Sequence, residues 1–238
     1  MKTWFISDLH LEAQQPSINR TLLAFFSTIA EQADALYILG DFFEYWVGDD
    51  QLETVMPIIK ALRQLNDRGV RLYFQHGNRD FLVGERFAQA TGCTLLPEQI
   101  VVDLYGTPTL LMHGDSLCTD DVEYQQARRL LRHPQWQQQF LSQPLAMRLA
   151  QAQAMRAQSR ESMQGKAYAI LDVNPQAVDT VLQTAGVTRL IHGHTHRPAV
   201  HEWQDTMGNK LQRIVLGDWH EDQPSYLCID AQTTRLVH

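Results

Sequence analysis

Residues 35–41 of this chain are ALYILGD. The apolar run through Leu36, Ile38 and Leu39 has the length and composition of a buried strand. It ends at a glycine followed by a carboxylate, Asp41. In an α/β sheet, ligands collect outside the carboxyl ends of the strands, so this carboxylate is a candidate functional residue. A single glycine–aspartate pair is also a common turn, so the interpretation depends on how the other apolar runs end.

Four other apolar runs also end in residues that can bind metals. They lead to the blocks D-L-H, G-N-R-D, H-G-D and G-H-T-H, which begin at Asp8, Gly77, His113 and Gly193. In an extended segment, D-x-H and H-x-H place both side chains on one face, because strand side chains alternate. A lone histidine at a strand end is more often an exposed polar residue than a ligand. Five blocks in this order are much harder to explain in that way.

Together the five blocks supply seven candidate metal ligands. Oxygen and nitrogen donors without thiolate favour manganese, iron, cobalt, nickel or zinc. Seven donors are too many for one tetrahedral ion and suit two ions that share a carboxylate. Two ions ~3.5–4 Å apart clamp the attacking and leaving oxygens of a phosphoryl displacement. The sequence therefore predicts a two-metal phosphoesterase site centred on Asp41, with the ligands Asp8, His10, Asp41, Asn78, His113, His194 and His196.

The alternation of apolar runs and amphipathic stretches predicts an α/β sandwich. Strands are expected at 3–7, at 70–74 and before each of the other blocks, with a turn at Tyr105–Pro108 and hairpins in the C-terminal tail. Helices are expected at 17–33 with Ser17 as N-cap, at 51–68, near 84–91 and from Asn174 to Gly186. This order predicts a four-layer α-β-β-α fold of two mixed sheets with helices outside.

Residues 118–166 differ from the rest of the chain and are expected to form a helical insertion. We predict a core of residues 1–117 and 167–238, with the insertion as a lid over the site. Between Tyr124 and Lys166 there are seven basic side chains and one acidic side chain, Glu161. Such an excess predicts an anion-facing surface, and its apolar side chains suit an amphiphile or a membrane surface. The alternative is a solvated charged face over an ordinary core.

Composition sets the broad class of protein. With 238 residues, 44% hydrophobic and 20% charged, the chain is expected to fold around a sizeable core. A net charge of −7 argues against a nucleic-acid partner. The three cysteines form no C-x-x-C pair, which suits a reducing compartment. No leader-like segment and no apolar run of the ~18 residues that span a bilayer is present, so we expect a cytoplasmic protein that at most docks on a membrane.

The motif series D-x-H, G-D, G-N, H and G-H-x-H resembles that of the calcineurin-like metallophosphoesterases. The longer segments FISDLHL, LYILGDFFEYWVGDD, HGNRDFL, HGDSLCTDD and IHGHTHRPAVH are similar to the members that hydrolyse UDP-2,3-diacylglucosamine in lipid A biosynthesis. This similarity covers essentially the whole chain. It implies that water activated by the metals attacks the α-phosphorus of a lipid-linked nucleotide sugar, which gives UMP and 2,3-diacylglucosamine 1-phosphate (lipid X). It also implies peripheral attachment to the cytoplasmic face of the inner membrane, with no obligate protein partner evident.

The resemblance also assigns roles to individual residues. It implies two Mn²⁺ ions, the first held by Asp8, His10, Asp41 and His196 and the second by Asp41, Asn78, His113 and His194. It implies catalytic roles for Asp41, Asn78, Arg79 and His194. It implies substrate contacts from Asn78, Arg79, Asp121, Ser159, Met163, Lys166 and His194.

Arg79 occupies a position where many members of the superfamily have a histidine. An arginine stays charged and does not protonate a leaving group, although it stabilises charge on phosphoryl oxygens. The loss of the acid is tolerable when the leaving group is a phosphate, whose second pKa is ~6. Arg79 therefore favours cleavage of a diphosphate over that of a simple ester. The alternative is that Arg79 only pairs with Asp80 or another carboxylate.

Two other classes of function remain at this point. One is a metal-dependent phosphodiesterase that acts on a soluble nucleotide, which needs the metals but no apolar lid. It would hydrolyse small diesters as well as a lipid substrate. The other is a metal-free binding scaffold on the same fold, which the seven filled ligand positions argue against.

Overall fold

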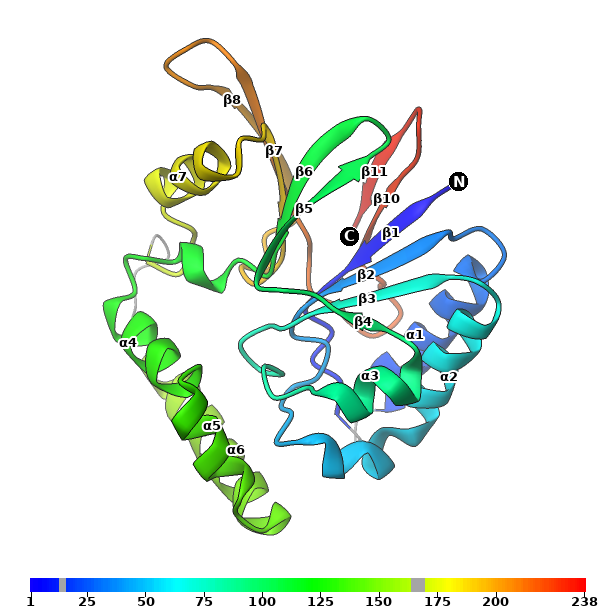
Figure 1. The fold of residues 1–238 in the computed structure, drawn as a ribbon, viewed down its shortest axis with the longest axis vertical. Helices are drawn as coiled ribbons and strands as arrows, with labels where there is room; N and C mark the ends of the chain where they lie inside the picture. The colour runs from blue at the N-terminus through cyan, green and yellow to red at the C-terminus, as the bar shows by residue number, and fades with distance from the viewer. Residues whose placement is uncertain (13–15, 164–169) are drawn as a thin grey trace.

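Two mixed β-sheets pack face to face, and helices cover their outer faces (Figure 1). The structure is a computed structural model that describes residues 1–12, 16–163 and 170–238. One apolar core lies between the two sheets. A second lies between the first sheet and its helices, and a third lies between the second sheet and its helix. The four-layer α-β-β-α architecture is confirmed.

The first sheet has the strand order β11-β10-β1-β2-β3-β4. Strands β1 to β4 are parallel, and β10 and β11 extend the sheet in antiparallel fashion. The carboxyl ends of β1, β2 and β3 therefore lie at one edge, where three of the sequence blocks begin. The strands are β1 Thr3–Ile6, β2 Ala35–Leu39, β3 Arg71–Gln75, β4 Thr94–Leu95, β10 Tyr226–Ile229 and β11 Thr234–Val237.

The second sheet has the strand order β5-β6-β7-β9-β8. Its central strands β6, β7 and β9 are parallel, and the remaining two blocks follow β6 and β7. The β5–β6 hairpin turns at Tyr105 and Gly106, whose φ values of 56° and 87° are typical of a two-residue turn that matches strand twist. The strands are β5 Gln99–Leu104, β6 Thr107–Met112, β7 Arg189–His192, β8 Ala199–Gln204 and β9 Lys210–Val215.

Helices α1 (Pro16–Ile29), α2 (Met56–Asp67) and α3 (Glu85–Thr91) cover the first sheet, and α7 (Pro175–Ala185) covers the second. Helix α7 begins as expected, because the Asn174 side chain accepts a hydrogen bond from the N–H of Ala177 at 3.1 Å. It ends at Gly186, whose φ is 64°.

Two helix starts differ from the sequence-based prediction. Helix α1 begins at Pro16, so Ser17 lies inside the helix and is not its N-cap. Proline suits the first turn, because its φ is already fixed near the helical value. The helix expected from residue 51 begins at Met56, with a proline in its first turn, and a 3₁₀ helix, η1 (Asp49–Val55), precedes it.

Residues 122–163 are helical, as expected, and they extend away from the sheets as an arm (Figure 1). The arm consists of α4 (Val122–Leu131), α5 (Pro134–Leu141) and α6 (Leu145–Met163), and a 3₁₀ turn, η2 (Asp115–Leu117), leads into it. Phe140 is buried in the same core as α1 to α3, and Trp136 packs beside it. The arm is therefore docked on the sandwich through apolar side chains as well as polar ones.

Candidate metal centre and cavity

The five sequence blocks meet at the carboxyl ends of their strands. Backbone hydrogen bonds join the loops: the N–H of Asp8 donates to the carbonyl of Gly40 at 3.1 Å, and that of Gly193 donates to the carbonyl of His113 at 2.8 Å. The N–H of His10 donates to the carbonyl of Asp41 at 3.0 Å. These bonds hold residues far apart in sequence in one small region.

The ligand-bearing loops are not extended, so the alternation argument for D-x-H and H-x-H was wrong. Five of the candidate ligands have left-handed backbone: φ is 56° at Asp8, 50° at His10, 50° at Asp41, 69° at His194 and 54° at His196. A non-glycine residue in this region costs ~1 kcal/mol. Side-chain direction at the site is therefore set by turns and not by strand alternation.

Two of the motif glycines are needed for close approach. A Cβ on Gly77 would lie 2.1 Å from Oδ1 of Asp41, and a Cβ on Gly193 would lie 2.3 Å from Oδ2 of Asp8. Only glycine lets these loops pass so near the two carboxylates. The G-N and G-H-x-H glycines thus have a steric role in the site.

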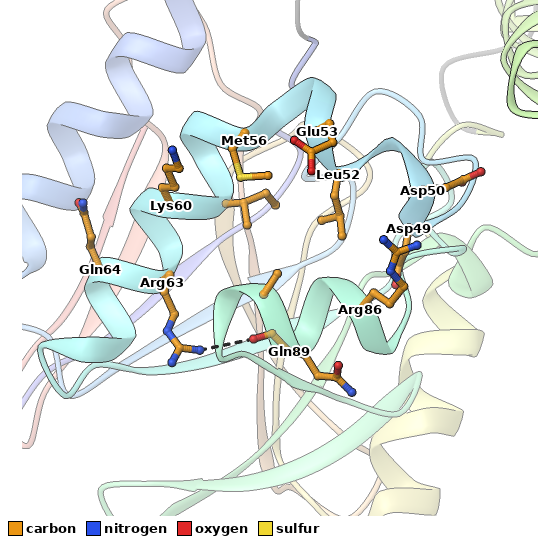
Figure 2. Close-up of a pocket in the computed structure, with 12 residues that line it drawn as sticks. Asp49, Asp50, Leu52, Glu53, Met56, Lys60, Arg63, Gln64, Arg86 and Gln89 are labelled. Atoms are coloured by element: carbon orange, nitrogen blue, oxygen red, sulfur yellow. Dashed lines mark hydrogen bonds between the residues drawn. The ribbon is translucent and has the colours of Figure 1, made fainter.

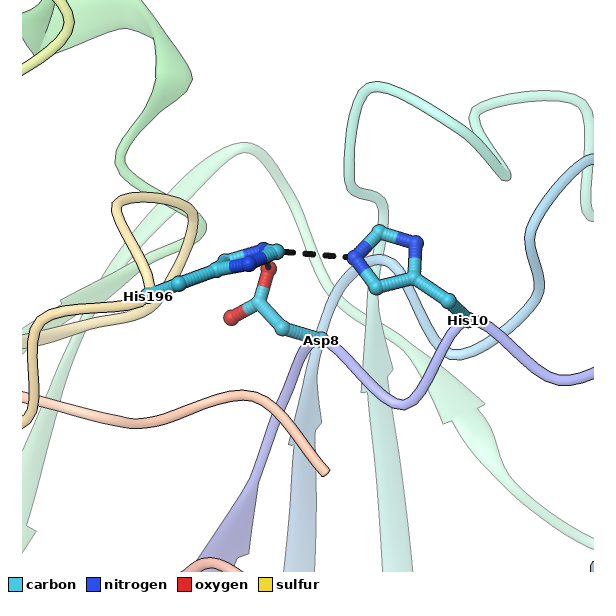
Figure 3. A group of neighbouring side chains, drawn as sticks. All are labelled: Asp8, His10 and His196. Carbon is cyan, nitrogen blue, oxygen red and sulfur yellow. Dashed lines mark hydrogen bonds and ion pairs between the residues drawn. The ribbon is translucent and has the colours of Figure 1, made fainter. Parts of the chain in front are cut away.

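Asp8, His10 and His196 form the first of two groups that could hold a metal ion (Figure 3). Nε2 of His10 lies 3.3 Å from Nε2 of His196, and Oδ1 of Asp8 lies 3.4 Å from the same atom of His196. Two ligand atoms at ~2.1 Å from a common ion are ~3.0–3.5 Å apart at tetrahedral or octahedral angles. Oδ1 of Asp8 is buried without a hydrogen-bond donor in the described chain. This donor set fits one divalent ion.

Asp41, His113 and His194 form the second group. Nε2 of His113 lies 3.6 Å from Oδ1 of Asp41 and 3.0 Å from Oδ1 of Asn78, so the asparagine lies beside this group as well. The seven residues identified from sequence are thus brought together as two neighbouring sets. The two groups and the family assignment below support a site for two metal ions.

Two carboxylates and a backbone carbonyl contact the Nδ1 atoms of three candidate ligand histidines. The sequence analysis did not identify the residues that supply these oxygens. Oε2 of Glu44 lies 3.0 Å from Nδ1 of His10, and Oδ2 of Asp218 lies 3.4 Å from Nδ1 of His196. Nδ1 of His113 lies 2.8 Å from the carbonyl oxygen of Leu39. Contacts of this kind fix the ring orientation and leave Nε2 for the ion. The D-F-F-E and G-D-W segments that supply the acids have no ligand spacing, so only the structure identifies them.

The two histidines of the G-H-x-H block differ in pKa. Burial would lower the pKa of His196, but contacts with Asp218 and Asp8 outweigh burial and raise it to about 10. Burial, together with the charge of His113, lowers the pKa of His194 to about 4. Without a metal, His196 is therefore protonated at neutral pH and His194 is neutral.

Asp80 organises the loops beneath the site. Its carboxylate accepts hydrogen bonds from the N–H groups of Gly77 and Phe42, each at 2.8 Å, and it is fully buried. Burial and the nearby charge of Asp41 raise the pKa of Asp80 to about 6. Because these oxygens are used by the backbone, the alternative that Arg79 only pairs with Asp80 is not supported. Within the described chain, Nε of Arg79 is buried without a hydrogen-bond partner.

A cavity of about 590 Å³ joins the second metal group to the helical arm. Of the expected substrate contacts, those within the described residues that line it are Asn78, Arg79, Asp121, Ser159 and His194. Met163 is the last residue of α6 and its side chain is outside the description, and Lys166 lies outside the described residues. The arm contributes an apolar wall that includes Leu131, Trp136, Phe140, Ala152 and Met155.

The expected anion-facing surface of the arm is present only in part: four of its arginines contact the core, and three of these, Arg128, Arg132 and Arg156, also line the cavity. The Arg128 guanidinium donates to Oδ2 of buried Asp115 at 2.7 Å, and that of Arg132 donates to the carbonyl of Gly77 at 2.9 Å. Arg148 pairs with Asp50, and Arg156 pairs with Glu44. The positive charge of the arm is therefore mainly used to attach it. Arg129 and Arg160 remain exposed.

A second hollow of about 640 Å³ lies between η1, α2 and α3 (Figure 2). It contains no member of either metal group. Its carboxylate Asp49 accepts from the N–H groups of Gly84 and Phe87, and Arg63 donates to the carbonyl of Gln89 at 3.4 Å. Since these groups serve local structure, cavity size alone does not identify the active site.

The family model of the calcineurin-like phosphoesterases matches residues 1–198. The chain belongs to this family, and the prediction of a metal-dependent hydrolase is confirmed. A solved archaeal phosphodiesterase that is 16% identical has the same fold, with a TM-score of 0.51 over 100% of this chain and 99% of that one.

Curated relatives are similar over almost their whole length. The UDP-2,3-diacylglucosamine hydrolase of Serratia proteamaculans is 52% identical over 100% of this chain and 98% of its own. The proteins of that name from Pseudomonas aeruginosa and Nitrosococcus oceani are also 52% identical. They cover 99% and 96% of this chain, and 98% and 91% of their own lengths.

Proposed function

We propose that this chain hydrolyses UDP-2,3-diacylglucosamine to UMP and 2,3-diacylglucosamine 1-phosphate (lipid X), a step of lipid A biosynthesis. The observation that carries the proposal is the cavity of about 590 Å³, which joins metal-binding residues to an apolar helical wall. A diphosphate bound at the metal end places attached acyl chains within reach of Trp136, Phe140 and Met155. The names of the 52% identical relatives support this substrate.

The proposed cofactors are two Mn²⁺ ions. Asp8, His10 and His196 would hold the first ion, and His113, His194 and Asn78 the second, with Asp41 shared between them. The oxygen and nitrogen donors of the two groups suit this ion. When bound, two divalent ions activate water and offset negative charge on phosphoryl oxygens.

The chain's own side chains bind and orient the diphosphate. Arg79 lines the cavity and keeps its charge, so its guanidinium faces the phosphoryl oxygens together with Asn78 and His194. Water forms the new bond to the α-phosphorus and the bridging P–O bond breaks, so the sugar phosphate leaves with the electron pair. That leaving group has a second pKa of ~6, so it needs no acid from this chain. Asp121, Ser159, Met163 and Lys166 are proposed to contact the rest of the substrate.

We assign the arm a role as a lid. In this proposal residues 118–166 are an insertion over the active site, and residues 1–117 and 167–238 are the metallophosphoesterase core. The arm forms one wall of the cavity while the core supplies Glu44, Asn78 and Arg79. The lid excludes water from the acyl chains and leaves the metal groups at the other end.

The proposed location is the cytoplasm, peripherally on the inner membrane. Among the described residues, no helix combines the length and apolarity needed to cross a bilayer. Large apolar side chains are nevertheless exposed on the arm, namely Val122, Leu130, Leu141, Met147 and Met155. Flotation with phosphatidylglycerol vesicles tests this: Leu130→Asp with Met147→Asp should reduce co-flotation, and equal flotation of both proteins would contradict it.

The experiment for the reaction is hydrolysis of UDP-2,3-diacylglucosamine in ¹⁸O water, with and without Mn²⁺. We expect Mn²⁺-dependent release of UMP that carries the label. Asp41→Ala should abolish it, and Asp103→Ala, in the exposed β5–β6 hairpin, should not. Label in the sugar phosphate would place the attack on the other phosphorus. No lipid cleavage with small diesters still hydrolysed would favour a phosphodiesterase for soluble nucleotides.

A further inference from the structure

Glu44 lies between a metal-binding histidine and the helical arm. Its two carboxylate oxygens have different partners: Oε2 lies 3.0 Å from Nδ1 of His10, and Oε1 accepts from Nε of Arg156 in α6. The Glu44 side chain is 9% exposed and that of Arg156 is 20% exposed. One buried carboxylate thus joins a residue of the first metal group to the arm.

The local backbone places Glu44 beside His10 but does not by itself fix the orientation of its carboxylate. The N–H of Glu44 donates to the carbonyl of Leu11 at 3.1 Å, and the N–H of Leu11 donates to the carbonyl of Phe42 at 2.9 Å. The segments that carry Glu44 and His10 are therefore paired with each other. The contact with Arg156 differs, because it exists only while α6 is docked against the core.

We propose that Glu44 is a positioning residue that couples docking of α6 to metal binding by the group of Asp8, His10 and His196. With Arg156 on Oε1, the carboxylate is held so that Oε2 faces Nδ1 of His10. That contact orients the ring so that Nε2 faces Nε2 of His196, which lies 3.3 Å away. Coupling between two binding events is reciprocal, so an ion in this group stabilises the docked position of α6 by the same free energy.

The arm therefore does more than cover the cavity. Arg156, Glu44 and Arg79 all line the cavity, so closing it over a ligand and completing the metal centre share one contact. Arg148 also attaches α6 to the core, through Asp50 and the carbonyl of Val47, but neither partner contacts a metal group. Of these two arginines of α6, Arg156 is the one whose partner contacts a residue of a metal group.

The first test is Mn²⁺ affinity, measured by isothermal titration of the metal-free, full-length chain without substrate. Arg156→Gln should weaken binding to the first group by ~5-fold or more, the lower end of typical coupling between sites. Glu44→Gln should weaken it by ~10- to 100-fold, as is usual for partners of metal-bound histidines. Arg160→Gln is the matched control, because it removes an exposed positive charge from the same helix. Unchanged affinity in Arg156→Gln would overturn the proposal.

The second test uses the reciprocal effect and requires only the wild-type chain. Addition of Mn²⁺ should slow amide hydrogen exchange in residues 145–163, and this slowing should be lost in Glu44→Gln and Arg156→Gln. Exchange in α6 that is the same with and without Mn²⁺ in the wild type would also overturn the proposal. Because no lipid is present, either negative result would leave the proposed hydrolysis standing.

Discussion

His196 lies between two carboxylates, those of Asp8 and Asp218, and carries a proton in the metal-free protein. A metal ion has to displace that proton, because the ligand is the neutral imidazole. The pKa of His196 is about 10 in the folded chain, against 6.5 for an ordinary histidine, and these two values set the pH range of this competition.

This pKa predicts opposite pH dependences for the metal-free and metal-loaded protein. The stabilisation of the metal-free fold by protonated His196 is complete below pH 6.5 and is lost as pH rises through about 10. Metal affinity should rise over the same range, by up to ~10-fold per pH unit for each proton displaced. Differential scanning fluorimetry from pH 6.5 to 9.5 should show a falling Tm in EDTA and a growing Tm increase with Mn²⁺. A Mn²⁺-induced increase that is independent of pH would contradict this.

At the scale of single residues, the sequence identified the candidate ligands better than the residues that support them. The seven candidate ligands belong to blocks whose spacing and order are informative. Glu44 and Asp218 contact the rings of His10 and His196. The sequence around these two acids has no motif that would identify them as functional residues. Asp115 stood in an identified block, yet its role of holding Arg128 and Tyr124 depends on residues of the arm.

At the scale of elements, the arm is attached by arginines at several points along its length. Arg148 forms an ion pair with Asp50 of η1 and also contacts the carbonyl of Val47. Its side chain is only 4% exposed. A Cβ on Gly48 would lie 2.5 Å from Nη1 of Arg148, so the loop before η1 is shaped around this guanidinium.

We predict that Arg148→Ala loosens the arm without unfolding the sandwich. The change leaves the carbonyl of Val47 and the Asp50 carboxylate without their donor, at a cost of ~1–3 kcal/mol. Limited proteolysis should cleave α5 and α6 at least several-fold faster than in the wild type, while the strands stay protected. Arg129→Ala removes an exposed arginine of α4 and is the control. Equal cleavage of the two variants would show that Arg148 does not anchor the arm.

The local composition of the arm does not predict the partners of its basic side chains. Counting basic residues predicted a surface for anions, because a local excess with few acids nearby is usually solvent-facing. The acids that neutralise them, such as Glu44, Asp50 and Asp115, lie far away in sequence on the core. Only the tertiary structure brings these charges together.

For the whole molecule, the proposed function makes the cavity between arm and sandwich the feature that selects substrates. Ala152 of α6 lines the cavity, whereas Ala154, on the same helix, does not line it. Ala152→Trp should lower kcat/KM for the diacylated substrate by ~10-fold or more, because a bulky ring occupies volume that the acyl chains need. Turnover of a small chromogenic phosphodiester should change by less than ~2-fold.

Ala154→Trp is the matched control and should leave both activities near the wild-type values. An equal loss of both activities in Ala152→Trp would indicate damage to the metal centre and not to an acyl site. No loss with the lipid would show that the chains lie elsewhere.

The layered architecture was predictable because its strands and helices have regular periodicity. The two sheets, the outer helices and the helical character of residues 122–163 follow from local patterns. The left-handed ligand loops and the cavity do not, because they arise where segments such as those around Asp41 and Gly77 approach within van der Waals contact.

The position of β1 between β10 and β2 also has a consequence for synthesis on the ribosome. By the time His196 has been translated, every member of both metal groups exists, but β10, which begins at Tyr226, does not. Until then Thr3–Ile6 have an unpaired strand edge, and such edges are sites of wrong pairing. A nascent chain that stalls between residues 196 and 226 therefore has all these candidate ligands on an incomplete sheet, with an exposed strand edge that favours aggregation.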